Sequence, residues 1–163
     1  MRVFQGAVFD VERRDGRDVV VHGPSVAVVA VDREEHVMLV RQQRVPAGGP
    51  VLELPAGVAE PGETPLASAQ RELAEETGLH GGVWVEVATF FTSPGYTDEL
   101  MHLFVATGVE RGEAHPEETE DLELVPVPLA EVPSLIEETE DAKTLVGLLM
   151  LVHLRATGTL PRA

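Results

Sequence analysis

The apolar positions of the chain fall into short runs separated by polar and turn-forming residues, which is the pattern of β-strands. Six of these runs follow Gly23-Pro24, a pair that interrupts extended structure. They span residues 25–32, 36–41, 51–54, 83–91, 100–108 and 122–127. Two more apolar-rich segments, 3–11 and 18–22, flank the polar residues 13–17 and predict an N-terminal β-hairpin.

One segment has clear signals of a helix. Thr64 is a favoured N-cap residue, Pro65 suits the first helical position, and Gly78 is typical just after a helix end. These signals predict a helix over residues 65–77. Its apolar residues recur at helical spacing and predict a buried stripe made of Leu66, Ala69 and Leu73.

Two further helices are expected towards the C-terminus. A short one falls within residues 128–140, and a longer one spans 142–157 and ends at Gly158. Strands interrupted by helices at two places predict an α/β fold, in which a mixed β-sheet is covered by helices on both sides. The expected organisation is a small N-terminal β-hairpin, residues 1–23, followed by a main domain, residues 24–163.

Composition narrows the possible functions. With 163 residues, 44% of them hydrophobic, the chain suits one domain with a sizeable core. Its net charge of −16 disfavours binding to a nucleic-acid backbone or an anionic membrane, and the lack of cysteine excludes disulfides. Charged residues come too early for a signal peptide, and the longest apolar run, 145–154, is too short to cross a bilayer. A cytoplasmic location is therefore expected.

Three carboxylates gather at the end of the predicted helix. Glu72 and Glu76 are one turn apart and Glu75 lies beside them, so the three share one face. Like charges at this spacing cost roughly a few tenths of a kcal/mol per pair, and the helix dipole disfavours anions in the last turn. Arg71 offsets part of this cost by pairing with Glu75. The cluster is either a solvated acidic face or a site for a hard cation such as Mg²⁺, which prefers oxygen ligands.

The wider pattern favours the cation site. Gly57 is followed six residues later by Glu63 and, after seven intervening residues, by Arg-Glu-Leu-Ala-Glu-Glu-Thr-Gly-Leu over residues 71–79. Every fixed position of this pattern matches the Nudix box, so the chain resembles the Nudix hydrolases. The resemblance implies an α/β/α sandwich with a mixed sheet. It also implies an enzyme that uses divalent metal ions to cleave nucleoside diphosphates linked to another group.

Residues outside the box resemble the ADP-ribose pyrophosphatase branch of this family. The main match is Ser-Pro-Gly-Tyr-Thr-Asp-Glu over residues 93–99, with Pro94 fifteen positions after Leu79. Further matches lie at residues 40–44, 52–57 and 115–120. A tight turn between strands also explains Ser-Pro-Gly. Both explanations hold together if the turn lines the pocket, and Pro94 is then expected among the substrate-binding residues.

The resemblance also implies the metal site. Glu72 and Glu76 would bind the ion together with the backbone carbonyl of Ala56, and Glu75 would be a further ligand when more than one ion is bound. Arg71 would orient the carboxylates. The expected ion is Mg²⁺, with Mn²⁺ as an alternative.

Substrate-binding and proton-transfer residues follow from the same resemblance. Arg44 would contact the diphosphate, because a guanidinium fork suits phosphate oxygens. Glu53 and Glu99 would contact the riboses, although each could equally be an ordinary surface acid. Glu118 and Glu120 occupy the positions of the catalytic base, with Glu120 also a candidate metal ligand. The alternative for both is a solvated acidic loop.

The predicted function is Mg²⁺-dependent hydrolysis of ADP-ribose to AMP and ribose 5-phosphate. Two alternatives are another nucleoside diphosphate sugar as substrate and a non-catalytic domain that senses nucleotides. The intact box disfavours the second. A homodimer is expected, because a two-stranded segment over residues 1–22 is marginally stable alone and the resembling enzymes dimerise through it. The number of metal ions and the choice of base between Glu118 and Glu120 stay open.

Overall fold

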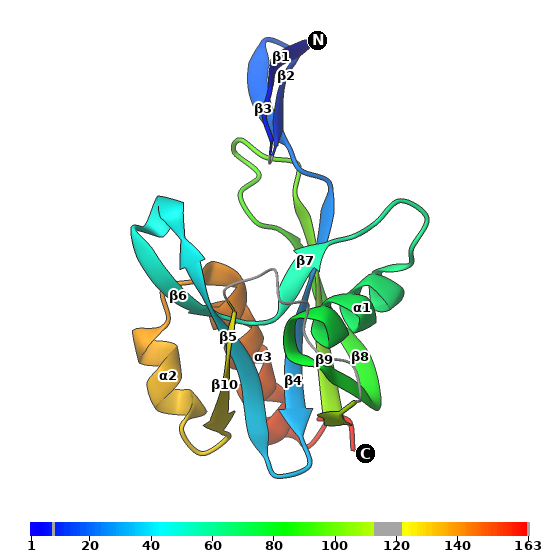
Figure 1. Cartoon of the computed structure of the whole chain (residues 1–163), viewed down its shortest axis with the longest axis vertical. Coiled ribbons are helices and arrows are strands. Elements are labelled where there is room, and N and C mark those ends of the chain that lie inside the picture. Colours follow the sequence, from blue (N-terminus) through cyan, green and yellow to red (C-terminus); the bar gives the residue numbers. More distant parts are fainter. Residues whose placement is uncertain (8, 113–121, 163) are drawn as a thin grey trace.

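The main part of the molecule is a mixed β-sheet (Figure 1). The computed structural model describes residues 1–7, 9–112 and 122–162. The strands of the main sheet are β4 (Pro24–Asp32), β5 (His36–Arg44), β6 (Gly49–Glu53), β7 (Ala56–Val58), β8 (Leu79–Phe91), β9 (Leu100–Arg111) and β10 (Glu123–Pro128). Their order is β10-β5-β4-β9-β8, while β6 pairs with β5 and β7 pairs with β4. Strands β4 and β9 are parallel, which makes the sheet mixed as predicted.

Helices cover both faces of this sheet. They are α1 (Pro65–Thr77), α2 (Val132–Glu138) and α3 (Ala142–Thr157), and Figure 1 shows α1 in front of the sheet with α3 behind it. The central strand β4 has the sequence PSVAVVAVD, and successive side chains alternate between the two faces. Val26 and Val28 pack with α1, whereas Ala27 and Val29 pack with α2 and α3. The predicted α/β/α sandwich is thus confirmed.

Helix α1 begins and ends where the sequence predicts. The side chain of Thr64 accepts a hydrogen bond from the backbone N–H of Ala67 at 3.2 Å, and Gly78 ends the helix with φ of 69°. The predicted buried stripe is wrong at one position, since Leu66 is 40% exposed while Ala69 and Leu73 are fully buried. Leu66 lies in the first turn, so the sheet covers the later turns of this face and not its beginning.

The C-terminal helices differ from the prediction in one respect. Helix α3 matches its predicted bounds and is capped by the Asp141 side chain, which accepts from the backbone N–H of Thr144 at 3.0 Å. The predicted helix over 128–140 is shorter, because its first residues complete β10 and a turn before α2. Gly147 lets α3 approach closely, since a Cβ there would lie 2.5 Å from the Leu54 side chain. None of the described helices combines the length and apolar character needed to cross a membrane.

The N-terminal segment forms a separate three-stranded sheet that stands away from the main sheet (Figure 1). Its strands are β1 (Arg2–Gln5), β2 (Asp10–Arg14) and β3 (Arg17–Val21). The β2–β3 hairpin was predicted, and its turn has the positive φ angles of Asp15 (49°) and Gly16 (79°). The single strand predicted over residues 3–11 is instead two strands, because the chain reverses where the N–H of Gly6 bonds to the carbonyl of Phe9 at 3.0 Å.

This small sheet is tied to the loop that precedes β9. The N–H of Val20 donates to the carbonyl of Tyr96 at 2.8 Å, and the N–H of Asp98 donates back to the carbonyl of Val20 at 3.2 Å. Arg14 adds an ion pair to Asp98 at 2.8 Å. The loop over residues 92–99 therefore takes its backbone partners partly from the N-terminal sheet.

Candidate active site

Two carboxylates of α1 meet the backbone of β7. The side chain of Glu76 accepts a hydrogen bond from the backbone N–H of Ala56 at 3.0 Å. Glu72 packs directly over Gly57, where an added Cβ would lie 2.0 Å from the carboxyl carbon and 2.2 Å from each oxygen. Only glycine leaves room for the carboxylate in this position. The box spacing thus brings a glycine of β7 and two acids of α1 to one point.

Arg71 holds these acids together. Its Nη1 donates to Glu72 at 2.8 Å and to Glu75 at 2.9 Å, which confirms the predicted Arg71–Glu75 pair. Its Nε and Nη2 face Glu63 at 3.2 to 3.3 Å, and Nη2 also donates to the carbonyl of Val58 at 3.2 Å. These partners, Glu63 foremost, raise the pKa of Arg71, and the Arg71 hydrogen bond in turn lowers the pKa of Glu63. The arginine is permanently charged and fixed in place.

The donor set at this point fits a hard divalent cation. A cation here would take carboxylate oxygens from Glu72 and Glu76 and the backbone carbonyl of Ala56, the residue whose N–H bonds to Glu76. Oxygen ligands of this kind suit Mg²⁺. The space left by Gly57 allows the Glu72 oxygens to approach the backbone of β7, so the residues present can form the predicted site. Glu75 is more exposed than Glu72 and pairs with the same nitrogen of Arg71.

A cavity of about 420 Å³ opens beside these carboxylates. Three of the predicted site residues line it: Arg44, Ala56 and Glu99. Its other lining residues are His22, Ser25, Val26, Gly57, Val58, Thr92, Ser93, Tyr96, Met101, Asp141, Ala142 and Lys143. Pro94 is exposed next to Ser93 and is not one of the lining residues of the described chain. The cavity therefore reaches from β7 to the loop over residues 92–99 and to the start of α3.

Arg44 is held at the cavity wall by a buried acid. Its Nε and Nη2 donate to the two oxygens of Glu53 at 2.6 and 3.0 Å, and Lys143 bonds to the same carboxylate from α3. The Glu53 side chain is only 3% exposed. Burial alone would raise the pKa of this carboxyl, but the hydrogen bonds from Arg44 and Lys143 outweigh it and lower the pKa. Glu53 is therefore a buried anion with two cationic partners.

Glu99 is fixed by two hydroxyl groups. Ser25 donates to one of its oxygens at 2.8 Å, and Thr92 donates to the other at 2.7 Å. Tyr96 comes from the same loop, lines the cavity and is 61% exposed. The loop thus presents an oriented carboxylate and an accessible aromatic ring to the cavity.

The family follows from these features and from a direct comparison. A family model described as the NUDIX domain matches residues 21–147, which is most of the chain. The chain belongs to the Nudix family. Its box residues are intact, and they bring Glu72 and Glu76 against Gly57 and Ala56 of β7. The predicted enzyme class, a Nudix pyrophosphohydrolase, is thereby confirmed.

Known proteins similar to this Nudix chain include two bacterial relatives at 38% identity. The methanol dehydrogenase activator of Bacillus methanolicus aligns over 155 residues, which are 90% of this chain and 84% of the relative. The ADP-ribose pyrophosphatase of Bacillus subtilis (strain 168) aligns over 160 residues, which are 90% of this chain and 86% of the relative. A crystal structure of an ADP compounds hydrolase matches the fold with a TM-score of 0.80 at 24% identity, covering 98% of this chain and 93% of that one.

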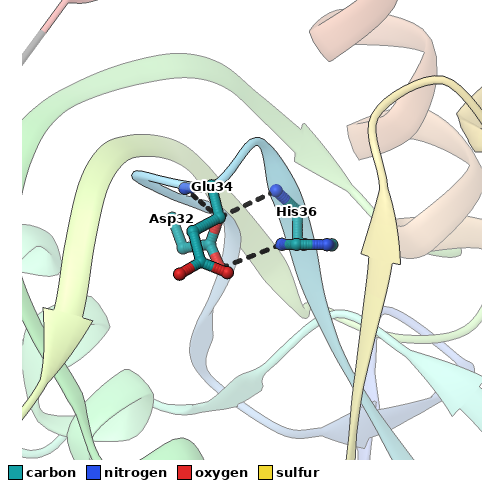
Figure 2. Close-up of side chains that lie close together, drawn as sticks. All are labelled: Asp32, Glu34 and His36. Atoms are coloured by element: carbon teal, nitrogen blue, oxygen red, sulfur yellow. Dashed lines mark hydrogen bonds and ion pairs between the residues drawn. The ribbon is translucent and has the colours of Figure 1, made fainter.

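A second cluster of titratable groups lies apart from the Nudix box. Asp32, Glu34 and His36 lie at the turn between β4 and β5 (Figure 2), at the opposite end of β4 from β7. A cavity of about 490 Å³ lies beside them. Asp32 accepts from the backbone N–H groups of Glu34 at 2.9 Å and His36 at 2.8 Å. These bonds are those of a tight turn, in which Glu35 has φ of 63°. The turn itself accounts for the cluster, and no predicted site residue belongs to it.

Sequence reasoning missed several cavity residues. Lys143 and Asp141 were not predicted, although Lys143 is the only lysine of a chain with 28 acidic residues and directly follows the start of a predicted helix. Ser25 and Thr92 carry no sequence signal that separates them from ordinary strand residues. The predicted bases Glu118 and Glu120 lie outside the described residues, so their role stays a prediction.

Proposed function

We propose that this Nudix enzyme hydrolyses the diphosphate bond of ADP-ribose, giving AMP and ribose 5-phosphate. One observation carries the proposal: the cavity shares the residues Ala56 and Gly57 with the carboxylate site, so a ligand in the cavity lies next to the candidate metal ligands. The 38% identity to a protein named ADP-ribose pyrophosphatase supports the choice of substrate. The volume of about 420 Å³ lies in the range of small-molecule sites.

In this proposal Mg²⁺, or Mn²⁺ in its place, is held by Glu72, Glu76 and the carbonyl of Ala56. Glu75 joins them when a second ion binds. Such an ion supplies Lewis-acid polarisation of a phosphoryl oxygen and lowers the pKa of bound water. Arg71 bridges Glu72 and Glu75 and keeps both carboxylates oriented, through the hydrogen bonds described above.

The substrate is bound by groups on the cavity wall. Arg44 contacts the diphosphate through its guanidinium, which Glu53 orients from behind. Glu99 faces the cavity with a fixed carboxylate and is the candidate for accepting a ribose hydroxyl. A ribose contact of Glu53 also stays a prediction, and both oxygens of Glu53 already bind cations. Pro94 shapes the loop that carries Glu99.

The proton acceptor for the attacking water is assigned to Glu118 or Glu120, with Glu120 also a candidate metal ligand. A carboxylate in this role contributes roughly 10²- to 10⁴-fold to the rate. Described acids near the carboxylate site already have hydrogen-bond partners, as Arg71 is for Glu63 and Glu72. This supports placing the base in the acidic segment that follows β9.

The proposal includes a cytoplasmic homodimer, with residues 1–23 making the contact between subunits. The exposed apolar side chains of the N-terminal sheet support this assignment, because a partner surface would cover them. They are Met1, Val3, Phe4 and Phe9. The substrate is a nucleoside diphosphate sugar, and neither nucleic acid nor membrane is expected as a partner of a chain with net charge −16.

The test is a comparison of kcat/KM for ADP-ribose, ADP-glucose and GDP-mannose with Mg²⁺, with the products separated and identified. ADP-ribose is expected to give the highest value, with AMP and ribose 5-phosphate as products. Omission of the metal with a chelator is the control, and it should abolish turnover. If a hexose nucleotide is preferred by tenfold or more, the alternative of another nucleoside diphosphate sugar replaces ADP-ribose. If no nucleotide is hydrolysed, the catalytic assignment is wrong.

A further inference from the structure

Lys143 is the only lysine in a chain with 28 acidic residues, and it lies at the cavity. Its side chain is 14% exposed, and its ammonium group pairs with Glu53 and, at 3.1 Å, with Asp141. These pairs tie the start of α3 to the end of β6. A purely structural tie would not require the lysine to border the same cavity as Arg44 and Gly57.

The ion pairs do not use all the donors of the two cations. An ammonium group has three N–H donors, and Glu53 and Asp141 occupy two of those on Lys143. Arg44 gives Nε and Nη2 to Glu53, and within the described residues its Nη1 has no hydrogen-bond partner. Among the described residues, each cation therefore keeps at least one donor for a ligand, while the buried Glu53 fixes where both lie.

The charges around the cavity show which ligand these donors suit. Among its described lining residues, Arg44 and Lys143 alone are lysine or arginine. They stand in the wall that also contains Ala56 and Gly57, beside Glu72 and Glu76. A diphosphate carries negative charge on both phosphoryl groups, and these carboxylates repel it. A metal ion at the carboxylates would neutralise part of the diphosphate charge. Arg44 and Lys143 can neutralise the remainder.

We propose that Lys143 binds the diphosphate of the substrate together with Arg44, and that Glu53 holds the two cations in a fixed arrangement. The ammonium acts as a point charge with one free donor, whereas the guanidinium offers a planar fork. This assignment rests on the proposed function, because it takes the cavity ligand to be a nucleoside diphosphate. It adds to the site a residue of α3, a helix that lies outside the Nudix box.

The first test compares Lys143→Gln with Lys143→Arg and with Arg155→Gln, which removes a positive charge from the far end of the same helix. Lys143→Gln should raise KM by about 10- to 100-fold, the worth of one charge-assisted hydrogen bond, with kcat changed by less than about threefold. Lys143→Arg should recover part of this loss, and Arg155→Gln should match wild type. A purely structural lysine is indicated, and the proposal overturned, if Lys143→Gln keeps the wild-type KM or loses only kcat and thermal stability.

A second test uses the wild-type enzyme and compares two amines of this chain, that of Lys143 and the N-terminal amine of Met1. Acetic anhydride at limiting concentration labels both, and mass spectrometry gives the two rates. Inorganic pyrophosphate with Mg²⁺ should slow labelling of Lys143 by about tenfold or more relative to Met1, whereas adenosine at equal concentration should not. Equal labelling of Lys143 with and without pyrophosphate overturns the proposal. This readout needs no turnover, so it can fail or succeed independently of the proposed reaction.

Discussion

Replacing Gly57 by alanine should disable the metal site while leaving the fold intact. The added Cβ would lie 2.0 Å from the carboxyl carbon of Glu72 and 2.2 Å from both oxygens. Since non-bonded carbon atoms settle at about 3.5 Å, the carboxylate must retreat by roughly 1.5 Å. The alanine itself is tolerated, because Gly57 lies in the extended strand β7 and is not one of the glycines with positive φ.

The Gly57→Ala change should affect metal affinity more than it affects the stability of the fold. Mg²⁺ demands ligand oxygens near 2.1 Å in a nearly ideal geometry, so a shift of about 1.5 Å removes Glu72 as a ligand. Metal affinity should then fall by at least about 10- to 100-fold, which is the usual cost of disturbing even an outer-shell group. For stability, the shift breaks the Arg71–Glu72 bond, but Arg71 keeps Glu63 and Glu75. The cost should be about 1–2 kcal/mol, or a drop in Tm of roughly 2–8 °C.

Calorimetric titration with Mg²⁺, kcat against Mg²⁺ concentration and a thermal melt measure these effects. Gly49→Ala is the matched control, because an added Cβ at Gly49 meets no atom within 4 Å. The reasoning is refuted if Gly57→Ala binds Mg²⁺ with wild-type affinity and turns over at the wild-type rate. A Tm lowered by more than about 10 °C would refute it differently, by placing the damage in the fold and not in the site.

Three more expectations can be checked on single variants. Glu76→Gln should weaken Mg²⁺ binding, and its rate should recover at higher Mg²⁺ concentration. If Glu120 is the base, Glu120→Gln should lower kcat by about 10²- to 10⁴-fold, and added Mg²⁺ should not restore the rate. Recovery of Glu120→Gln with added Mg²⁺ would make Glu120 a metal ligand. The lowered pKa of Glu53 means that its ion pairs stabilise the fold above the ordinary value of 4.5 and are lost as the pH falls through the lowered value. The free energy of unfolding should therefore exceed that of Glu53→Gln by about 3 kcal/mol at pH 7, and urea titrations at pH 3 should show a smaller difference, while a constant difference would contradict the ion-pair argument. A chain that starts at Gly23 should be monomeric by light scattering if residues 1–22 make the dimer contact, and a dimer of undiminished activity would contradict it.

The elements that the sequence predicted are those with local signals. Helix α1 was predicted to the residue because Thr64, Pro65 and Gly78 mark its ends in the chain itself. Strand β7 was missed, since its three residues are too few to show alternation. The exposure of Leu66 depends on how far the sheet extends beneath the helix, and periodicity does not contain that information.

The candidate site likewise has residues that local sequence signals predicted and residues that they could not predict. The box spacing identified Glu72 and Glu76 because their shared face follows from the helical repeat. The partners of Glu53 could not be predicted, since Lys143 is 90 residues away in the sequence and meets it only through the packing of α3 on the sheet. Ser25 and Glu99, 74 residues apart, are a second pair of this kind, brought together by the parallel strands β4 and β9.

The contact between the N-terminal sheet and the loop over residues 92–99 couples local opening of that sheet to ligand binding in the cavity. If the small sheet opens locally, Val20 leaves, and the backbone groups of Tyr96 and Asp98 lose their partners to water. A ligand that needs Tyr96 and Glu99 in place therefore binds best when the sheet is closed. Linkage is reciprocal. A partner that binds only the closed sheet must therefore raise the affinity of the cavity ligand by the same factor by which that ligand raises the affinity of the partner. Hydrogen exchange at the amide of Val20 would then report occupancy of a cavity that this amide does not line.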